Sequence, residues 1–130
     1  MRDAEYHVLA RFRYALRVFL RFSEDAARGA GLTPNQHQLL LAVKGFPTGA
    51  PTISDVAEWL QLQHHSTVEL VDRVVDAGFV ERHVDLHDRR RQRLALTKAG
   101  ERKLATLSAA HREELRRFRD EMAEVLRELG

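Results

Sequence analysis

A short arginine-rich segment is the part of the sequence best suited to contact an acidic partner. It lies between two short apolar runs and holds four arginines within five positions: Arg89, Arg90, Arg91 and Arg93. Guanidinium groups bind phosphate oxygens through paired hydrogen bonds, so the segment favours a polyanion such as nucleic acid. A solvated turn that keeps a hairpin edge soluble would use the same residues, and the segment alone does not decide between the two.

The overall charge of the chain adds little evidence for nucleic-acid binding. Twenty-one basic residues face 19 acidic ones, which leaves a net charge of +2 at pH 7. Because the charge is nearly balanced, nucleic-acid binding has to be argued from where the arginines gather and from the elements that position them.

Composition narrows the class of protein. A chain of 130 residues, 44% hydrophobic and 31% charged, is expected to form one globular domain. The absence of cysteine excludes disulfides, thiolate metal sites and cysteine redox sensing. Arg11, Arg13 and Arg17 interrupt the apolar residues near the N-terminus, so no secretory leader is expected and a cytoplasmic location is predicted.

Enzymatic chemistry has no support in the sequence. There is no glycine-rich phosphate loop and no nucleophile motif. Asp85 and Asp88 could form a carboxylate pair, but they share a loop with arginines and have no apolar enclosure to raise a pKa for acid catalysis. We therefore expect a protein that is not an enzyme and has no cofactor.

Hydrophobic spacing and capping residues predict a mostly helical fold that positions the basic loop. The expected helices cover residues 4–28, 34–43, a short stretch capped by Thr52 or Ser54, 64–77 and 98–128, and the expected strands cover 79–84 and 92–96. A further short strand is expected at 52–53. The order is α–α–α–α–β–β–α, with the arginines at the tip of the hairpin.

This order indicates a winged helix-turn-helix. The tight break near residues 62–63 joins two short helices, and a basic hairpin follows them directly. An α-helix fits the major groove of DNA, where each base pair shows a distinct hydrogen-bonding pattern. An arginine-bearing loop can reach the neighbouring minor groove, which attracts cations where it is narrow.

Residues 33–100 resemble the winged-helix core of the MarR family of bacterial transcriptional regulators. The most specific match is "DRRRQRLALTKAG", which carries the family's wing pattern of Asp-x-Arg followed by Leu-Thr-x-x-Gly. The matching residues are Asp88, Arg90, Leu96, Thr97 and Gly100. The segment "HSTVELVDRVVDAGFVERH" is similar to the family's recognition helix and first wing strand, and the flanking helices are similar to its dimerisation helices.

The resemblance implies a single MarR-like domain over residues 1–130, with a DNA-binding core at 33–97. It implies a homodimer that binds double-stranded DNA at a pseudo-palindromic operator, in the role of a repressor released by a small molecule. Arg90 would enter the minor groove, oriented by Asp88. Arg89, Arg91 and Arg93 are the candidates for phosphate contacts.

The start of the fourth helix is the expected base-reading end. Gln, Ser and Thr side chains can bond base edges or phosphate, and a helix N-terminus favours an anion. The candidate residues are Gln63, His64, His65, Ser66, Thr67 and, two turns on, Arg73. Ser66 and Thr67 would equally favour helix initiation, and Arg73 could instead pair with Glu69.

The terminal helices, 4–28 and 98–128, carry more apolar residues than one small core can cover, which predicts pairing with a second chain. The alternative is that the two helices pack over their own core. In the resembled family, ligands bind between these helices and the winged core. Phe12, Phe19, Phe22, Leu40 and Phe46 could line such a site but are equally good core residues, so no effector is assigned.

Two other hypotheses remain open. Seven histidines would allow a metal-responsive regulator of the same fold, although no H-x-x-E-H or H-x₃-H pattern occurs on any one of the expected helices. Those beside the expected DNA contacts would also gain charge below about pH 6.5. A winged-helix protein-interaction module is the second alternative.

Overall fold

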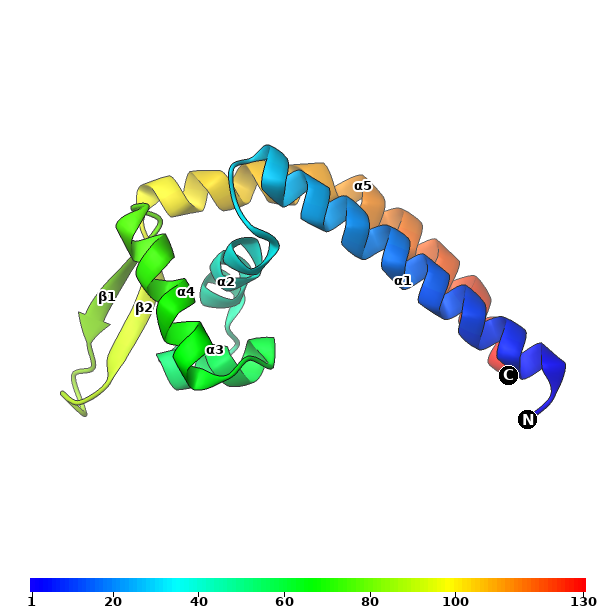
Figure 1. Cartoon of the computed structure of the whole chain (residues 1–130), viewed down its shortest axis with the longest axis horizontal. Coiled ribbons are helices and arrows are strands. Elements are labelled where there is room, and N and C mark those ends of the chain that lie inside the picture. The colour runs from blue at the N-terminus through cyan, green and yellow to red at the C-terminus, as the bar shows by residue number, and fades with distance from the viewer.

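Figure 1 shows a winged core joined to a long helical arm. The structure, a computed structural model, describes residues 1–130. Its elements are α1 (Asp3–Gly29), α2 (Pro34–Gly45), α3 (Ile53–Leu60), α4 (His64–Asp76), β1 (Val80–Val84), β2 (Gln92–Leu96) and α5 (Lys98–Leu129). The order and nearly all the boundaries match the sequence prediction. α1 and the C-terminal part of α5 lie side by side and extend away from the core.

Side-chain caps fix where the core helices begin. The Thr33 hydroxyl accepts a hydrogen bond from the Gln36 amide at 3.2 Å, and the Gln36 side-chain oxygen accepts one from the Thr33 amide at 3.0 Å. Thr52 forms the same reciprocal pair with Asp55, so Thr52 rather than Ser54 caps α3. Such boxes satisfy backbone donors that a helix start would otherwise leave free.

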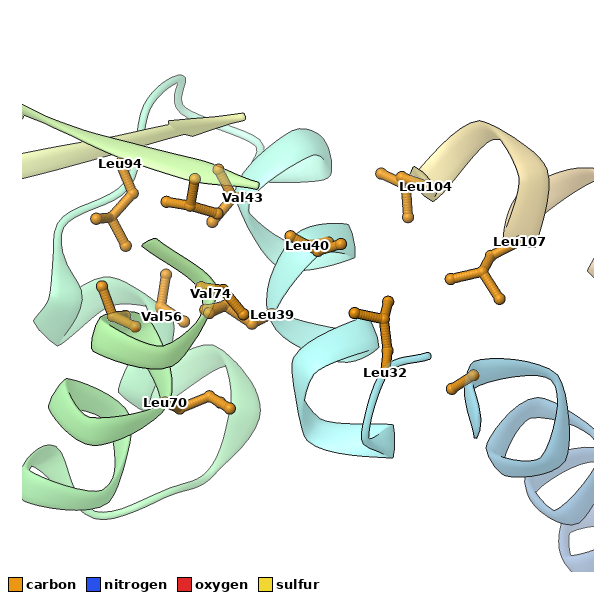
Figure 2. Close-up of a cluster of buried hydrophobic side chains, with 13 residues drawn as sticks. Leu32, Leu39, Leu40, Val43, Val56, Leu70, Val74, Leu94, Leu104 and Leu107 are labelled. Carbon is orange, nitrogen blue, oxygen red and sulfur yellow. The ribbon is translucent and has the colours of Figure 1, made fainter. Parts of the chain in front are cut away.

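The core lies between α2, α3, α4, the hairpin and the first turns of α5 (Figure 2). Its largest fully buried side chains include Leu39, Leu40, Val56, Val71, Val74, Val80 and Leu94. The hairpin contributes to the same cluster as the helix-turn-helix, because Val80 and Leu94 face inward from its two strands. The burial of this shared apolar surface is what holds the hairpin in place beside α4.

Two details differ from the sequence prediction. The short strand expected at 52–53 is only a single antiparallel bridge between Thr52 and Arg93. The apolar spacing of residues 56–60 predicts that Trp59 faces inward, but it is 54% exposed and its ring packs at an angle against Phe46, with the centroids 5.4 Å apart. In α3 the inward positions are filled by the smaller Val56 and Ala57.

α5 runs unbroken from Lys98 to Leu129 and so links the core to the arm in one element. None of the helices combines the length and the apolar character that crossing a membrane would require.

Gly100 allows α5 to approach the end of α4 and the start of the hairpin. A Cβ atom at this position would lie 2.1 Å from the carbonyl oxygen of Phe79. That oxygen also accepts a hydrogen bond from the Thr97 amide at 3.0 Å, so it cannot move freely. The glycine of the wing pattern is therefore required by a backbone contact.

We predict that Gly100→Ala lowers the free energy of unfolding by about 1–3 kcal/mol, because the added methyl group forces the backbone apart. Gly45→Ala is the matched control: no atom lies within 4 Å of its Cβ position, so alanine should raise stability by about 0.5–1 kcal/mol. Urea unfolding of both variants measures the difference. Equal stability of Gly100→Ala and the wild type would contradict the role given to this contact.

Candidate nucleic-acid interface

The hairpin tip and the start of α4 flank one cleft. The cleft has a volume of about 340 Å³ and is lined by Thr52, Ile53, Ser54, Asp55, His64, Arg89, Arg90, Arg91 and Gln92. Figure 1 shows the hairpin tip and the α3–α4 turn at the same end of the core. The basic loop and the expected reading helix are therefore presented in the same direction.

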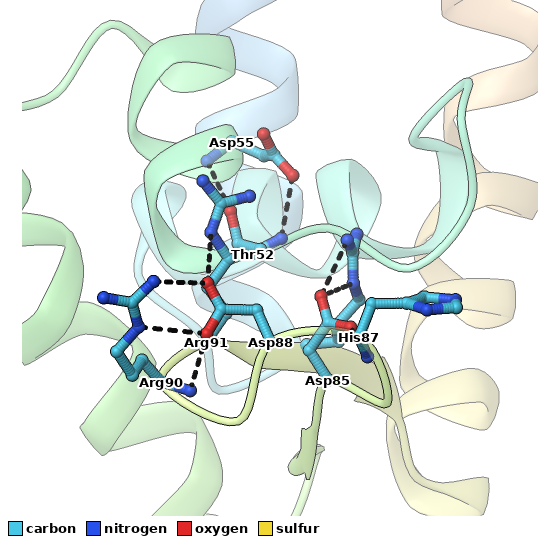
Figure 3. A network of polar contacts seen from close by, with 8 residues as sticks. Thr52, Asp55, Asp85, His87, Asp88, Arg90 and Arg91 are labelled. Atoms are coloured by element: carbon cyan, nitrogen blue, oxygen red, sulfur yellow. Dashed lines mark hydrogen bonds and ion pairs between the residues drawn. The ribbon is translucent and has the colours of Figure 1, made fainter.

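The contact expected between Asp88 and Arg90 is present. Oδ1 of Asp88 accepts hydrogen bonds from the Arg90 backbone amide at 3.0 Å and from its Nε at 3.1 Å (Figure 3). These bonds, the side-chain one first, hold the pKa of Asp88 below its ordinary value. The Arg90 side chain is nevertheless 91% exposed. Asp88 thus orients the Arg90 side chain, whose guanidinium remains open to solvent.

Arg89 and Arg91 flank Arg90 and are exposed. Arg91 lies 3.9 Å from Asp88, whereas Arg89 forms no ion pair. Both side chains are free to approach a phosphate backbone, and their phosphate contacts remain predictions.

Arg93 differs from the other three arginines. Its Nε and Nη2 each lie 3.0 Å from Oδ2 of Asp85, and its Nη1 donates to the carbonyl oxygen of Ala50 at 2.7 Å. Asp85 is buried, and the hydrogen bond from the His87 amide, followed by the Arg93 guanidinium, lowers its pKa. The sequence identified Arg93 as a candidate phosphate contact, but here its guanidinium is bonded within the chain.

The first turn of α4 exposes most of the residues expected there. Gln63 precedes the helix and makes no capping hydrogen bond with its side chain, and His64 and His65 are exposed. Ser66 is half-buried. Thr67 is fully buried and donates its hydroxyl to the carbonyl oxygen of Gln63 at 2.9 Å. A side chain in that position cannot touch DNA, so Thr67 is withdrawn from the candidate contacts and stabilises the helix start instead.

Further along α4, Arg73 is exposed and forms no ion pair with Glu69. The carboxylate of Asp72 forms an ion pair with Arg82 of β1. This pair neutralises an acidic side chain on the helix expected to meet DNA and links that helix to the wing. Sequence reasoning missed Arg82, because its position ten residues after Asp72 gives no local spacing signal.

A second hollow separates the arm from the core. This cavity of about 800 Å³ is lined by Phe19, Leu20, Ser23, His37, Gln38, Leu41, Ser108, His111, Arg112, Leu115, Arg116, Phe118 and Arg119. Of the five ligand-lining residues considered from sequence, Phe19 alone lines it. Leu40 is fully buried in the core, and Phe46 packs on Trp59.

Two histidines connect the arm and the core at this cavity. His111 of α5 bonds the Leu107 carbonyl through Nδ1 at 2.6 Å and the Ser23 hydroxyl of α1 through Nε2 at 2.9 Å. His37 of α2 is 4% exposed, lies with its ring centroid 5.1 Å from that of His111, and its Nδ1 has no hydrogen-bond partner. No group of three or more histidine, aspartate or glutamate side chains is placed to hold a metal ion.

The fold and the wing define a winged helix-turn-helix protein. Residues 30–91 match the model of the MarR family. The search of curated proteins found no match.

Three similar solved structures have the same fold. AbsC, a MarR family transcriptional regulator from Streptomyces coelicolor, gives a TM-score of 0.79 at 22% identity over 99% of this chain and 88% of its own. The apo form of MarR from E. coli gives 0.75 at 18% identity, over 90% and 89% of the two chains. The MepR–DNA complex of S. aureus gives 0.71 at 19% identity, over 84% and 80%.

The predicted resemblance is confirmed: residues 30–91 match the model of the MarR family, and the chain has the fold of the solved MarR-family proteins. AbsC is described as a transcriptional regulator.

We predict that stability falls as the pH drops below about 6.5. Burial, followed by the neighbouring His111, lowers the pKa of His37 from 6.5. The unfolded chain therefore takes up a proton at a higher pH than the folded chain, and protonation favours unfolding. Urea unfolding at pH 7.5, 6.5 and 5.5 measures the loss.

His37→Leu removes this titration and should flatten the pH dependence, while His65→Gln, at an exposed position, should leave it unchanged. An equal pH dependence in the wild type and His37→Leu would show that His37 is not the responsible group.

Proposed function

We propose that the protein is a sequence-specific regulator of transcription that binds double-stranded DNA as a homodimeric repressor. α4 would lie in the major groove and Arg90 would enter the adjacent minor groove. The observation that supports this most strongly is the common cleft between the start of α4 and Arg89–Arg91. The S. aureus complex provides independent support, because a protein of the same fold is described there bound to DNA.

The proposed contacts divide by chemistry. Gln63, His64, His65 and Ser66 would meet base edges or phosphates at the helix start. Arg73, Arg89 and Arg91 would meet the phosphate backbone. Phosphate contacts fix the register of a protein on DNA, whereas base contacts select the sequence. Because α4 has few basic residues, the affinity of the protein for DNA would depend mainly on the wing.

The arm supports the proposed dimer. Although α1 and α5 pack on one another, both still expose large apolar side chains: Tyr6, Leu9, Tyr14, Val18, Leu20, Leu115, Leu126 and Leu129. Pairing two arms about a twofold axis would remove this surface from water. It would also place two α4 helices about 34 Å apart, the spacing of one DNA turn. The operator would then be pseudo-palindromic.

The cavity supports a small-molecule effector. It lies where α1 and α5 of the arm meet α2 of the core, so a bound ligand would change the angle between the two parts. Arg112, Arg116 and Arg119 line it, no carboxylate does, and His37 offers an unpartnered Nδ1. These groups favour a largely apolar ligand with an acidic group. A cytoplasmic location fits a protein with this role.

The protein-interaction module remains the alternative function. Binding that depends little on salt would favour it, since DNA binding releases counterions and weakens steeply as salt rises. A metal-responsive role would require a change in operator binding during a zinc titration.

We predict that Arg90→Ala weakens binding to a selected operator by about 1–3 kcal/mol, or about 5- to 160-fold, through loss of the minor-groove contact. Fluorescence anisotropy measures the affinity, and size-exclusion chromatography checks that the dimer is intact. Arg13→Ala, an exposed change on the arm, is the control and should bind normally. Unchanged binding by Arg90→Ala would remove the wing from the mechanism.

We predict that Arg89→Gln reduces the dependence of log affinity on log salt by about one phosphate contact per subunit. The measurement is a series of binding curves between 50 and 200 mM salt, concentrations over which phosphate contacts change affinity strongly (roughly 10³–10⁵-fold for 6–10 contacts). An unchanged slope would show that Arg89 stays in solvent.

A further inference from the structure

We propose that Asp85 and Arg93 are positioning residues, which hold the wing tip in line with α4 and do not themselves contact DNA. The proposal rests on the proposed function, because it concerns how the same DNA-binding surface is arranged. It assigns Arg93 a role different from that of the three arginines beside it in the sequence.

The Arg93 guanidinium has two acceptors on two different segments. Its Nε and Nη2 donate to Oδ2 of Asp85 at 3.0 Å, on the strand-to-tip side of the wing. Its Nη1 donates to the carbonyl oxygen of Ala50 at 2.7 Å, in the segment that leads into α3. A guanidinium is a planar fork, so bonds in two directions fix its orientation. In this orientation all three of its nitrogen atoms already bond within the chain.

Asp85 transmits this constraint to the tip. It is 6% exposed, and its other carboxylate oxygen accepts a hydrogen bond from the His87 amide at 2.8 Å. Its own amide donates to the Arg91 carbonyl at 3.0 Å, which closes the loop behind Arg90. One buried carboxylate therefore bonds both the first turn of the tip and the guanidinium beneath it (Figure 3).

The segment 50–52 completes the connection to the reading helices. The Leu94 amide donates to the Pro51 carbonyl at 2.8 Å, and Thr52 forms a bridge with Arg93. Thr52 then caps α3. The path from the wing tip to the start of α3 thus runs through a continuous series of hydrogen bonds. Loss of the Asp85–Arg93 pair would release the tip from this path.

Asp85→Asn tests the proposal because the positioning role and a purely electrostatic role predict opposite changes in operator affinity. Asparagine keeps an oxygen for the His87 amide but cannot pair with the Arg93 cation. Removing a negative charge beside DNA, and freeing an arginine for phosphate, would strengthen binding if position did not matter. The positioning role predicts the opposite, a loss of operator affinity of about tenfold.

Glu81→Gln is the matched control, since it removes an exposed carboxylate from β1 that bonds only His83. It should leave affinity equal or slightly higher. Tighter or unchanged binding by Asp85→Asn would overturn the proposal.

A double-mutant cycle provides the second test. Arg93→Gln should weaken binding as much as Asp85→Asn, and the double variant should be no worse than either single one, because all three break the same pair. Additive losses would show that Arg93 contacts DNA independently of Asp85, which would overturn the positioning role.

Hydrogen exchange provides a readout that needs no DNA. In Asp85→Asn the amides of residues 85–91 should exchange faster while those of α2 and α4 stay protected. Unchanged exchange at the tip would overturn the proposal even if the proposed function held. If the tip exchanges faster in Asp85→Asn but the wild-type protein fails to bind DNA, the result would still support the pair as the contact that holds the wing tip. It would contradict only the proposed function. Global loss of protection would show that the pair supports the whole fold and would overturn its specific role at the tip.

Discussion

The arrangement of the candidate DNA-binding surface depends on one apolar core that the hairpin and the helix-turn-helix share. Val80 and Leu94 enter the same buried cluster as Val71 and Val74 of α4. Because interiors are close-packed, a strand that contributes to this cluster cannot shift without opening a cavity. The basic tip is carried at the end of that hairpin, so its direction relative to α4 is set by core packing. Polar contacts then adjust the tip itself.

The charges at this surface are arranged in two groups. Arg89, Arg90 and Arg91 project into solvent at the tip, and the single acid beside them, Asp88, is bonded to Arg90. Behind them, Arg82 and Arg93 are paired with Asp72 and Asp85. The paired arginines cancel acidic side chains that would oppose a polyanion. A chain with a net charge of only +2 can present a basic wing tip in this way, although Asp55 in the cleft and Glu69 on α4 form no ion pair.

The sequence was sufficient for the elements and their order because the signals are local. Capping residues such as Thr33, Thr52 and Thr97 mark helix starts within three residues, and the wing pattern combines several of these signals. It was insufficient wherever a residue's role depends on a distant partner. Arg93 and Arg89 lie in the same arginine-rich segment and look alike in sequence. They differ only in the structure, where Arg93 bonds the carbonyl oxygen of Ala50 and the buried carboxylate of Asp85.

Thr67 and Trp59 show the same limit for burial. A threonine at a helix start can face DNA or the core, and the sequence permits both. The structure buries it because α4 packs that face on the core. Trp59 sits at an apolar position of α3 but lies on the surface against Phe46, while Val56 and Ala57 form the buried face of the helix. The domain boundaries and the proposed contact residues remain predictions.

The arm adds a route by which the surface could be regulated. α5 is one helix from the end of the wing to the end of the arm, so under the proposed function a change at the cavity would reach the wing through a single element. His37 and His111 lie at the point where α2, α1 and α5 meet. The unpartnered Nδ1 of His37 there underlies the predicted dependence of stability on pH. The proposed acidic ligand would meet Arg112, Arg116 and Arg119, of which Arg116 and Arg119 form ion pairs with Glu113 and Asp120.

Selection of bound sequences from a random pool of double-stranded DNA is the most direct measurement of whether α4 and the wing read one duplex from the same face. The expected result is a twofold-symmetric consensus, with half-sites about one helical turn apart and A·T-rich steps where the wings reach the minor groove. Failure to enrich any consensus from the pool, with binding that depends little on salt, would contradict a DNA-reading role for this surface.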